Sequence, residues 1–168
     1  MELLLNQNKV VLFDDADWPL VSQHHWSAGK TGTVGLWYAK TKTCDANGNR
    51  KTVTMHRMIL AAKPGQLTDH RNGNGLDNRR ENIRLTDYSG NNRNRRRDEH
   101  KEFKGTYRNK WGSARLWEAR IRITKEKRLI IRGFKTEIEA ARAYDQLAKE
   151  HHGEFARLNF PESELAAE

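Results

Sequence analysis

The sequence predicts an α+β protein built from two small domains, and three observations lead to this prediction. Short apolar runs separated by Asn-Gly and Pro-Gly turns fill the first 95 residues, which is typical of short strands and helices. Residues 93–104 then carry almost no apolar side chains, as expected of a linker. Three strand-like runs and one amphipathic helix follow, which is enough to close a second core. We therefore expect a first domain over 1–95, a basic and polar linker over 96–103, a second domain over 104–161 and an acidic tail over 162–168.

The first domain is expected to alternate short strands with short helices. Residues 3–13 are typical of a β-hairpin, and the acids at 14–17 favour a helix from Trp18 to about Trp26. The Asp45–Asn49 turn separates two further strands, and Pro64-Gly65 ends a helix that begins near His56. The remaining expected elements are the strands at 37–39, 53–55 and 83–85 and a helix at 88–94, capped by Thr86-Asp87.

The second domain is expected to be a three-stranded sheet packed against one helix. The strands are predicted at 105–108, 117–123 and 128–132, and the middle one alternates between apolar and charged residues. Thr136 and Glu139 have the spacing of a capping box, which starts a helix that runs to about His151 and ends at Gly153. We expect the arginines of the strands to project from the face opposite the helix, namely Arg108, Arg120, Arg122 and Arg132.

The charge of the chain predicts a polyanionic partner. The net charge is +9 with a pI near 9.8, and residues 93–160 hold 19 basic against 10 acidic side chains. Cys44 is the single cysteine, so neither a disulfide framework nor a structural zinc site is expected. No apolar run is long enough to span a bilayer, and no signal peptide is recognised at the start. We expect a cytoplasmic protein of a bacterial host or phage-infected cell that does not bind membranes. The sequence does not determine the oligomeric state, and a monomer is favoured.

The segment from Asp69 to Asn91 has the residue types of a phosphodiester-cleaving site. Each asparagine in it could simply form a turn, but the Asp69-His70 step among them favours chemistry. A hard cation prefers oxygen ligands, which Asp69 and Asn91 offer, with Asn92 as the alternative to Asn91. His70 titrates near neutral pH and can act as general base. One divalent cation is expected, Mg²⁺ first and Mn²⁺ as the alternative.

The chain from about residue 3 to 95, and specifically residues 55–94, resembles the HNH nuclease motif in its ββα-metal form, as found in phage and intron-encoded homing endonucleases. The resemblance rests on Asp69-His70 followed by Asn82 and Asn91, and on the surrounding segments 55–60 and 69–85. It implies that His70 is the general base and that Asp69 and Asn91 hold the metal. It also implies that Asn82 orients the histidine or tightens the loop. The third motif position is asparagine instead of histidine, which makes zinc a poorer candidate for the catalytic metal.

Residues 104–161 resemble the AP2 DNA-binding domain over its full length. The matching segments are 105–108, 117–121, 133–136, 139–145 and 158–160. The resemblance implies a three-stranded antiparallel sheet that lies in the major groove of double-stranded DNA. Arginine on such a face can bond guanine or grip phosphate, and Trp111 could stack on sugar edges. The expected DNA-binding residues are Arg57, Arg93, Arg95, Arg96, Arg108, Trp111, Arg120, Arg122 and Arg132.

These features predict a metal-dependent, site-directed DNA endonuclease of the homing type, in which the second domain chooses the target. The alternative is a DNA-binding transcriptional regulator whose HNH domain does not cut. An RNA-binding or RNA-cutting protein ranks last, because the sheet lacks the exposed aromatic pairs of a single-strand RNA platform.

Overall fold

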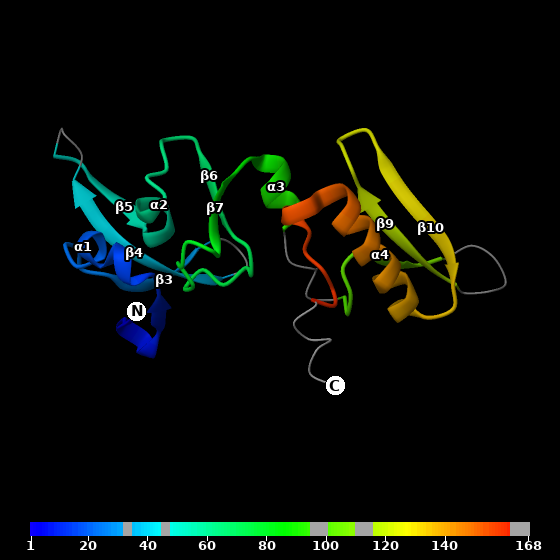
Figure 1. Ribbon diagram of the computed structural model, residues 1–168, viewed down its shortest axis with the longest axis horizontal. Helices are drawn as coiled ribbons and strands as arrows, with labels where there is room; N and C mark the ends of the chain where they lie inside the picture. Colours follow the sequence, from blue (N-terminus) through cyan, green and yellow to red (C-terminus); the bar gives the residue numbers. More distant parts are fainter. Residues whose placement is uncertain (32–34, 45–47, 95–100, 110–115, 162–168) are drawn as a thin grey trace. The chain divides into compact units, whose positions relative to one another are not determined.

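A computed structural model describes residues 1–31, 35–44, 48–94, 101–109 and 116–161 of the chain. The chain divides into two compact units, residues 1–91 and 92–168, which are described separately (Figure 1). Each unit combines antiparallel sheets with helices, so the expected α+β class is confirmed. The division falls between Asn91 and Asn92, and the finer boundaries at 95, 103 and 161 stay predictions.

Unit 1 contains three small antiparallel sheets joined by short helices. The first is the hairpin β1–β2, the second has the order β3-β4-β5, and the third pairs β6 with β7. The elements are β1 Glu2–Leu4, the 3-10 turn Asn6–Asn8, β2 Val10–Leu12, the 3-10 turn Asp15–Asp17, α1 Trp18–Val21, β3 Ser27–Thr31, β4 Leu36–Cys44, β5 Arg50–Thr54, α2 Met55–Ile59, β6 Leu67–His70, β7 Ile83–Thr86 and α3 Tyr88–Arg93. Strand, strand and helix thus follow one another from residue 67 to 93.

The core of unit 1 gathers side chains from both ends of its sequence. Val11, Phe13, Val21 and Met55 are almost completely buried, and they pack with Ile83 of β7 in one cluster. The N-terminal hairpin therefore supplies much of the apolar surface that holds the later elements together. Burial of this kind is the main favourable contribution to folding.

Two expectations for unit 1 need correction. The helix expected to reach Trp26 ends at Val21, because the chain folds back and the Trp26 indole N–H donates to the Val21 carbonyl at 2.9 Å. The strands β3 and β6 were not expected, since neither has an alternating apolar pattern. The hairpin β1–β2, the strand pair β4–β5, α2 and α3 are confirmed to within a few residues.

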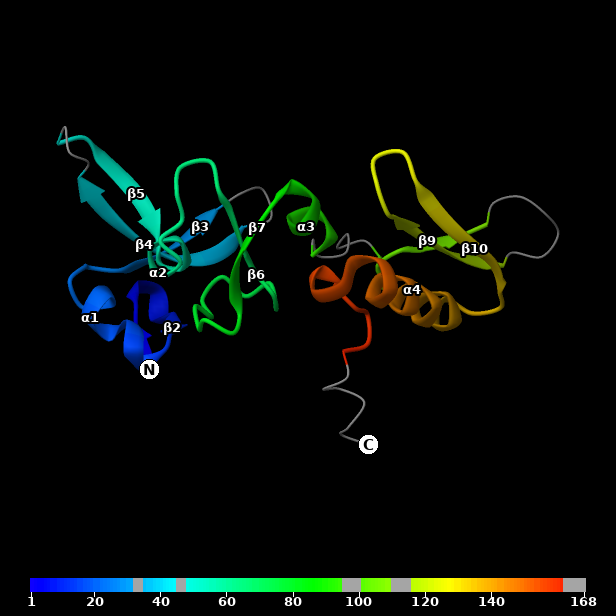
Figure 2. The same ribbon diagram turned by 45° about the horizontal axis from the view of Figure 1, so that its top comes forward.

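Unit 2 is a three-stranded antiparallel sheet with one long helix on one face (Figures 1 and 2). The strands are β8 Thr106–Arg108, β9 Trp117–Arg122 and β10 Arg128–Phe134, in the order β10-β9-β8. The helix α4 spans Glu137–His152, and a 3-10 turn follows at Gly153–Phe155. Three antiparallel strands and one helix are thus confirmed.

The capping box expected at the start of α4 is confirmed. The Thr136 side chain accepts from the Glu139 backbone N–H at 3.2 Å, and the Glu139 carboxylate accepts from the Thr136 backbone N–H at 3.2 Å. Two backbone donors that the first helical turn leaves unpaired are satisfied in this way. The helix then buries Ala141, Tyr144 and Ala148 toward the sheet.

A glycine and an aspartate lock the ends of unit 2 onto the helix. Gly105 has φ +78°, and a Cβ there would lie 2.0 Å from the Tyr144 ring, so only glycine fits. Asp145 accepts from the backbone N–H groups of Asn159 and Phe160, both at 2.9 Å. The C-terminal segment is therefore tied to the buried side of α4.

Candidate catalytic site and candidate nucleic-acid interface

The hairpin β6–β7 places Asp69 and His70 side by side at the end of a strand. Asp69 is paired in register with Arg84, and His70 with Ile83. One Asp69 carboxylate oxygen, Oδ2, accepts from Arg84 Nη2 at 2.9 Å and from Nε at 3.2 Å. Only 11 % of the Asp69 side chain and 7 % of the Arg84 side chain are exposed. The predicted metal ligand is therefore held in a nearly buried ion pair that the sequence did not indicate.

Asn82 closes the loop between these two strands. Its backbone carbonyl accepts from Arg71 N at 2.8 Å, and its side-chain oxygen accepts from Asn72 N at 3.0 Å. Its amide group donates to the Asp77 carbonyl at 2.7 Å. This is the geometry of a residue that tightens the loop, which is one of the two roles that the HNH resemblance implies.

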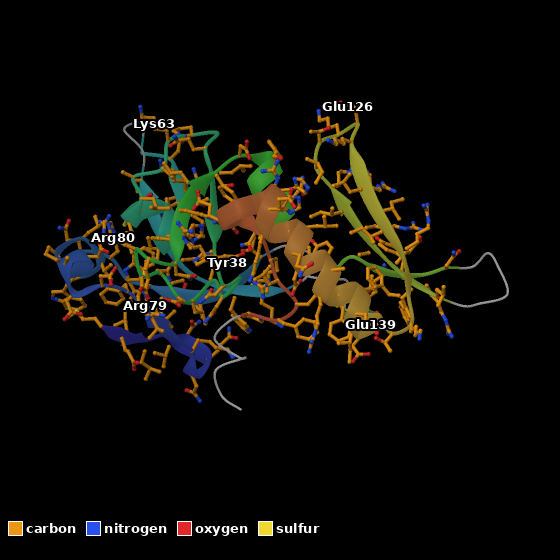
Figure 3. All side chains as sticks on the ribbon, turned by 45° about the vertical axis from the view of Figure 1, so that its right-hand side comes forward. Tyr38, Lys63, Arg79, Arg80, Glu126 and Glu139 are labelled. Carbon is orange, nitrogen blue, oxygen red and sulfur yellow. The ribbon has the colours of Figure 1, made fainter. Side chains whose placement is uncertain are left out.

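Contacts within this loop and with other parts of unit 1 hold it in place. Arg79 donates to Asp77 through Nε and Nη2, both at 2.8 Å, while Arg80 forms an ion pair with Asp17 at 2.6 Å (both arginines are labelled in Figure 3). Gly75 must be a glycine, because a Cβ there would lie 2.4 Å from the Trp37 carbonyl oxygen. The loop is thus pressed against β4.

His70 lies in a buried cluster of polar and aromatic side chains. Its Nε2 lies 3.4 Å from Asn78 Oδ1, and its ring centroid is 4.5 Å from that of His56 and 5.7 Å from that of Tyr38. The amide oxygen can only accept, so this contact is a hydrogen bond in the His70 tautomer that carries its proton on Nε2. The arrangement keeps one basic nitrogen on a histidine whose ring is fixed on several sides.

Burial keeps both histidines of this cluster neutral. Desolvation lowers the pKa of His56 to about 3, and the neighbouring His70 and Arg57 add to the effect. Desolvation also lowers the pKa of His70, while the Asn78 hydrogen bond and the charges of Asp69 and Asp77 oppose it. At neutral pH the His70 imidazole is therefore in the form that can accept a proton.

The oxygen donors expected for a metal suit a hard cation but form no ready-made cluster. Asp69 contributes a carboxylate that is already paired with Arg84, and Asn91 is exposed on α3. Within residues 1–31, 35–44, 48–94, 101–109 and 116–161, no three His, Cys, Asp or Glu side chains gather into a metal site. A metal held by Asp69 and Asn91 would therefore depend on amide, water and phosphate oxygens, and it stays a prediction.

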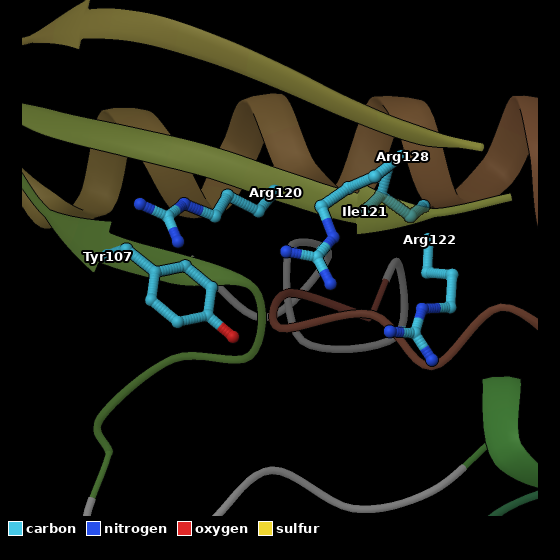
Figure 4. Close-up of a pocket in the computed structure, with 5 residues that line it drawn as sticks. All are labelled: Tyr107, Arg120, Ile121, Arg122 and Arg128. Atoms are coloured by element: carbon cyan, nitrogen blue, oxygen red, sulfur yellow. The ribbon is translucent and has the colours of Figure 1, made fainter. Parts of the chain in front are cut away.

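The sheet of unit 2 turns a basic face away from α4. Arg122 and Arg128 lie directly opposite each other on β9 and β10, and Arg120 is opposite Ile130. Figure 4 shows how Tyr107, Arg120, Ile121, Arg122 and Arg128 line a pocket of about 240 Å³ on this sheet. The side chains of Ala119 and Ile121 belong to the core cluster on the helix side, as predicted for β9. Glu118 was expected among the exposed residues of this strand, but it is buried.

Sequence reasoning placed one residue on the wrong face and missed two others. Arg108 is paired in register with Trp117, and its guanidinium lies 5.9 Å from the Trp117 ring centroid, so it does not share the face of Arg120. Tyr107 occupies that face instead, opposite Glu118. Arg128 was missed because Leu, Ile and Ile follow it, and such a run does not show which face β10 presents. Only the pairing with β9 settles the question.

The remaining predicted DNA-binding residues are only partly described by the structure. Arg57 donates to the carbonyls of Gln66 at 2.6 Å and Lys63 at 3.0 Å, which closes the loop after α2. Arg93 is half-buried, with its Nη2 3.5 Å from the Ile123 carbonyl oxygen. Arg95, Arg96 and Trp111 lie outside the described residues. A role in DNA binding stays a prediction for each of the nine residues.

Comparison with known proteins gives a similarity over part of the chain. Dehydration-responsive element-binding protein 2A of Arabidopsis thaliana is 44 % identical over 65 residues, which is 38 % of this chain and 18 % of that protein. Dehydration-responsive element-binding protein 2E of the same plant is 41 % identical over 69 residues, or 36 % of this chain and 27 % of that protein. The chain thus spans less than a third of the length of these relatives.

The other comparisons add no support for a catalytic domain. No family model and no solved structure matches the chain. No helix among the described residues is long and apolar enough to cross a membrane. The similarity to the two plant proteins agrees with an AP2-type DNA-binding domain, whereas the HNH-type nuclease domain stays a prediction.

Proposed function

We propose that the chain is a double-stranded DNA-binding protein whose unit 2 contacts DNA through the face of β8, β9 and β10 that points away from α4. The observation that carries this proposal is the pair Arg122 and Arg128, which lie directly opposite each other beside Arg120. Like charges placed in this way destabilise a sheet, so their grouping is best explained by an anionic partner. The two plant relatives are named as responsive element-binding proteins, which supports the same conclusion.

Equilibrium binding in a salt series tests the proposal. The wild-type chain is first used to enrich a duplex from a random-sequence library, and its affinity for that duplex is measured by fluorescence anisotropy. Arg122→Gln and Arg128→Gln should each weaken binding about tenfold, or should lower the slope of log K against log salt by about 0.9 where the contact is to phosphate.

Lys149→Gln is the matched control for these two variants. It removes the same charge from the exposed part of α4, a helix that packs against the opposite face of the sheet. It should leave the affinity within about twofold of wild type. If all three variants bound alike, general attraction between a basic protein and DNA would explain the binding, and the proposed face would be wrong.

We propose phosphodiester hydrolysis at His70 as a second function. It is favoured by a neutral, ring-fixed histidine next to Asp69, on a loop tightened by Asn82. In this proposal the lone pair of His70 accepts the proton of a water whose oxygen bonds to the phosphorus. One P–O ester bond breaks, and the leaving oxygen takes up a proton from solvent. Asp69 and Asn91 would hold a divalent cation, which supplies charge neutralisation at the scissile phosphate when bound. The chain would then be a targeted endonuclease, and without cleavage it would be a DNA-binding regulator.

Nicking of a supercoiled plasmid that carries the enriched duplex separates these two possibilities. Wild type should nick in Mg²⁺ or Mn²⁺. The nicking rate of His70→Ala should be lower by at least about 10²-fold, which is the lower end of the rate enhancement that a general base provides. His25→Ala, an exposed histidine of the same unit, should nick like wild type. Absence of nicking by wild type in both metals would leave the regulator as the function.

A further inference from the structure

Glu118 is an acidic residue at the centre of the basic face. It lies in β9, the middle strand, between Tyr107 of β8 and Arg132 of β10, each directly opposite it. Only 3 % of its side chain is exposed, whereas 63 % of the Arg132 side chain is exposed. A carboxylate in this position weakens attraction to DNA phosphates, so its presence on a DNA-binding face needs another explanation.

The Glu118 carboxylate holds two arginines at once. Its Oε1 accepts from Arg120 Nε at 2.7 Å and also from Arg120 Nη2. Its Oε2 accepts from Arg132 Nε at 3.1 Å. Because each guanidinium has five N–H donors, both arginines keep further N–H groups that Glu118 does not use. The carboxylate therefore fixes the plane of each guanidinium while leaving donors for a ligand.

Tyr107 fixes the same cluster from the side. Its ring lies 4.5 Å from the Arg120 guanidinium carbon and 3.6 Å from Lys101 Nζ, both measured to the ring centroid. A cation over an aromatic face is attracted by the ring. Arg120 is thus held in two directions, by an ion pair along the strand and by a ring from the neighbouring strand.

Arg122 and Arg128 provide the contrast on the same face. No acidic side chain in the described part of unit 2 forms an ion pair with either of them. Among the described residues, the face therefore has two arginines that a carboxylate orients before any ligand arrives and two that show no acidic partner. Orienting a long side chain in advance removes part of the entropy cost of binding.

We propose that Glu118 is a positioning residue that aims Arg120 and Arg132 at base edges and so sets which DNA sequence is recognised. The inference deepens the DNA-binding function proposed above and rests on it. An arginine whose guanidinium is fixed can bond a guanine in two-point geometry only where the base lies at the matching place, whereas a freely moving arginine can turn to the nearest phosphate. Glu118 thus lowers the affinity for DNA of any sequence but increases the discrimination between sequences.

The test compares Glu118→Gln with a variant that has the same change in net charge. Glu150→Gln serves as this control, since its side chain is 70 % exposed on α4. Affinity is measured for the enriched duplex and for a scrambled duplex of equal length and composition, at one salt concentration. Glu118→Gln should lower the ratio of the two affinities about tenfold, as expected when two side chains lose their orientation. Glu150→Gln should keep the wild-type ratio.

A second variant and a second measurement guard against misfolding. Glu118→Asp keeps the buried charge but withdraws it from both guanidinium groups, and it should also lower the ratio. NMR signals of the Arg120 and Arg132 Nε–H groups should exchange slowly with water in wild type and fast in Glu118→Gln, with or without DNA.

Three outcomes are possible. A lower ratio in both Glu118 variants together with fast Nε–H exchange in Glu118→Gln supports the proposal. An unchanged ratio in either variant, or unchanged Nε–H exchange, overturns it. If wild type bound no DNA, the proposed function itself would fail, and the exchange data would still show whether Glu118 holds the two arginines.

Discussion

The buried His56 should make unit 1 sensitive to mild acid. Its pKa is about 3 in the folded chain, against an ordinary value of 6.5, because burial disfavours the imidazolium. As pH falls below 6.5, the unfolded chain takes up a proton on His56 that the folded chain cannot. The contribution of neutral His56 to the free energy of unfolding is therefore fully present above pH 6.5, and it is lost as the pH falls toward 3.

The size of the effect follows from the two pKa values. Between pH 7 and pH 5, a group that titrates at 6.5 when unfolded and at about 3 when folded lowers the free energy of unfolding by about 2 kcal/mol. His56→Gln removes the titrating group and should remove this part of the pH dependence, whatever its effect on stability at pH 7. His25→Gln, at an exposed position of the same unit, is the control for replacing a histidine by glutamine.

Native-state hydrogen exchange is the suitable assay, because it reports unit 1 separately from unit 2. The peptide that contains β5 and α2 gives the free energy of opening at pH 7 and pH 5, after correction for the intrinsic exchange rate. Wild type should lose about 2 kcal/mol more than His56→Gln between the two pH values. Equal losses in the two chains would refute the assignment of a neutral, buried His56.

Four further changes should lower the stability of unit 2, measured by urea unfolding or by hydrogen exchange of α4 peptides. Thr136→Ala removes one half of the capping box and should lower the free energy of unfolding by about 1 kcal/mol. Unchanged protection of α4 from hydrogen exchange would contradict this expectation. Gly105→Ala should destabilise by roughly 2–5 kcal/mol, since its Cβ meets the Tyr144 ring. Gly133→Ala, which has φ +101° but open space around it, should do so by less than Gly105→Ala. Asp145→Ala removes the acceptor of two backbone N–H groups and should cost about 3 kcal/mol; a change below 1 kcal/mol would show that the C-terminal segment is not held there.

The fold of unit 2 was predictable because its sequence signals are local. The alternation in β9 and the Thr136–Glu139 spacing each lie within one element. The capping box is confirmed, and so is the alternation except at Glu118, which is buried. The composition of the basic face was less predictable. Which way Arg108 and Arg128 point depends on the register between strands, which no pattern within a three-residue strand or an Ile-Ile run can show.

The candidate site of unit 1 was predictable only in its sequence-adjacent part. Asp69 and His70 follow one another in the sequence. Asn82 immediately precedes β7, and its side-chain oxygen accepts from the Asn72 backbone N–H in the loop that joins β6 to β7. The pairing of Asp69 with Arg84 and the packing of Tyr38 on His70 join residues from separate elements. Such contacts are products of tertiary structure, and the sequence has no local pattern that encodes them.

The N-terminal hairpin has a consequence for any attempt to isolate the candidate catalytic segment. The Leu12 backbone donates to the Leu76 carbonyl at 2.8 Å and accepts from Asn78 N at 2.7 Å, so β2 forms a bridge with the loop that carries Asn78. A fragment that began after residue 13 would keep every residue of the expected motif. It would lose the backbone partner that places Asn78 beside His70. A fragment that keeps the geometry of this site therefore has to include β1 and β2. In a fragment trimmed to the motif, Asn78 would no longer be held beside His70.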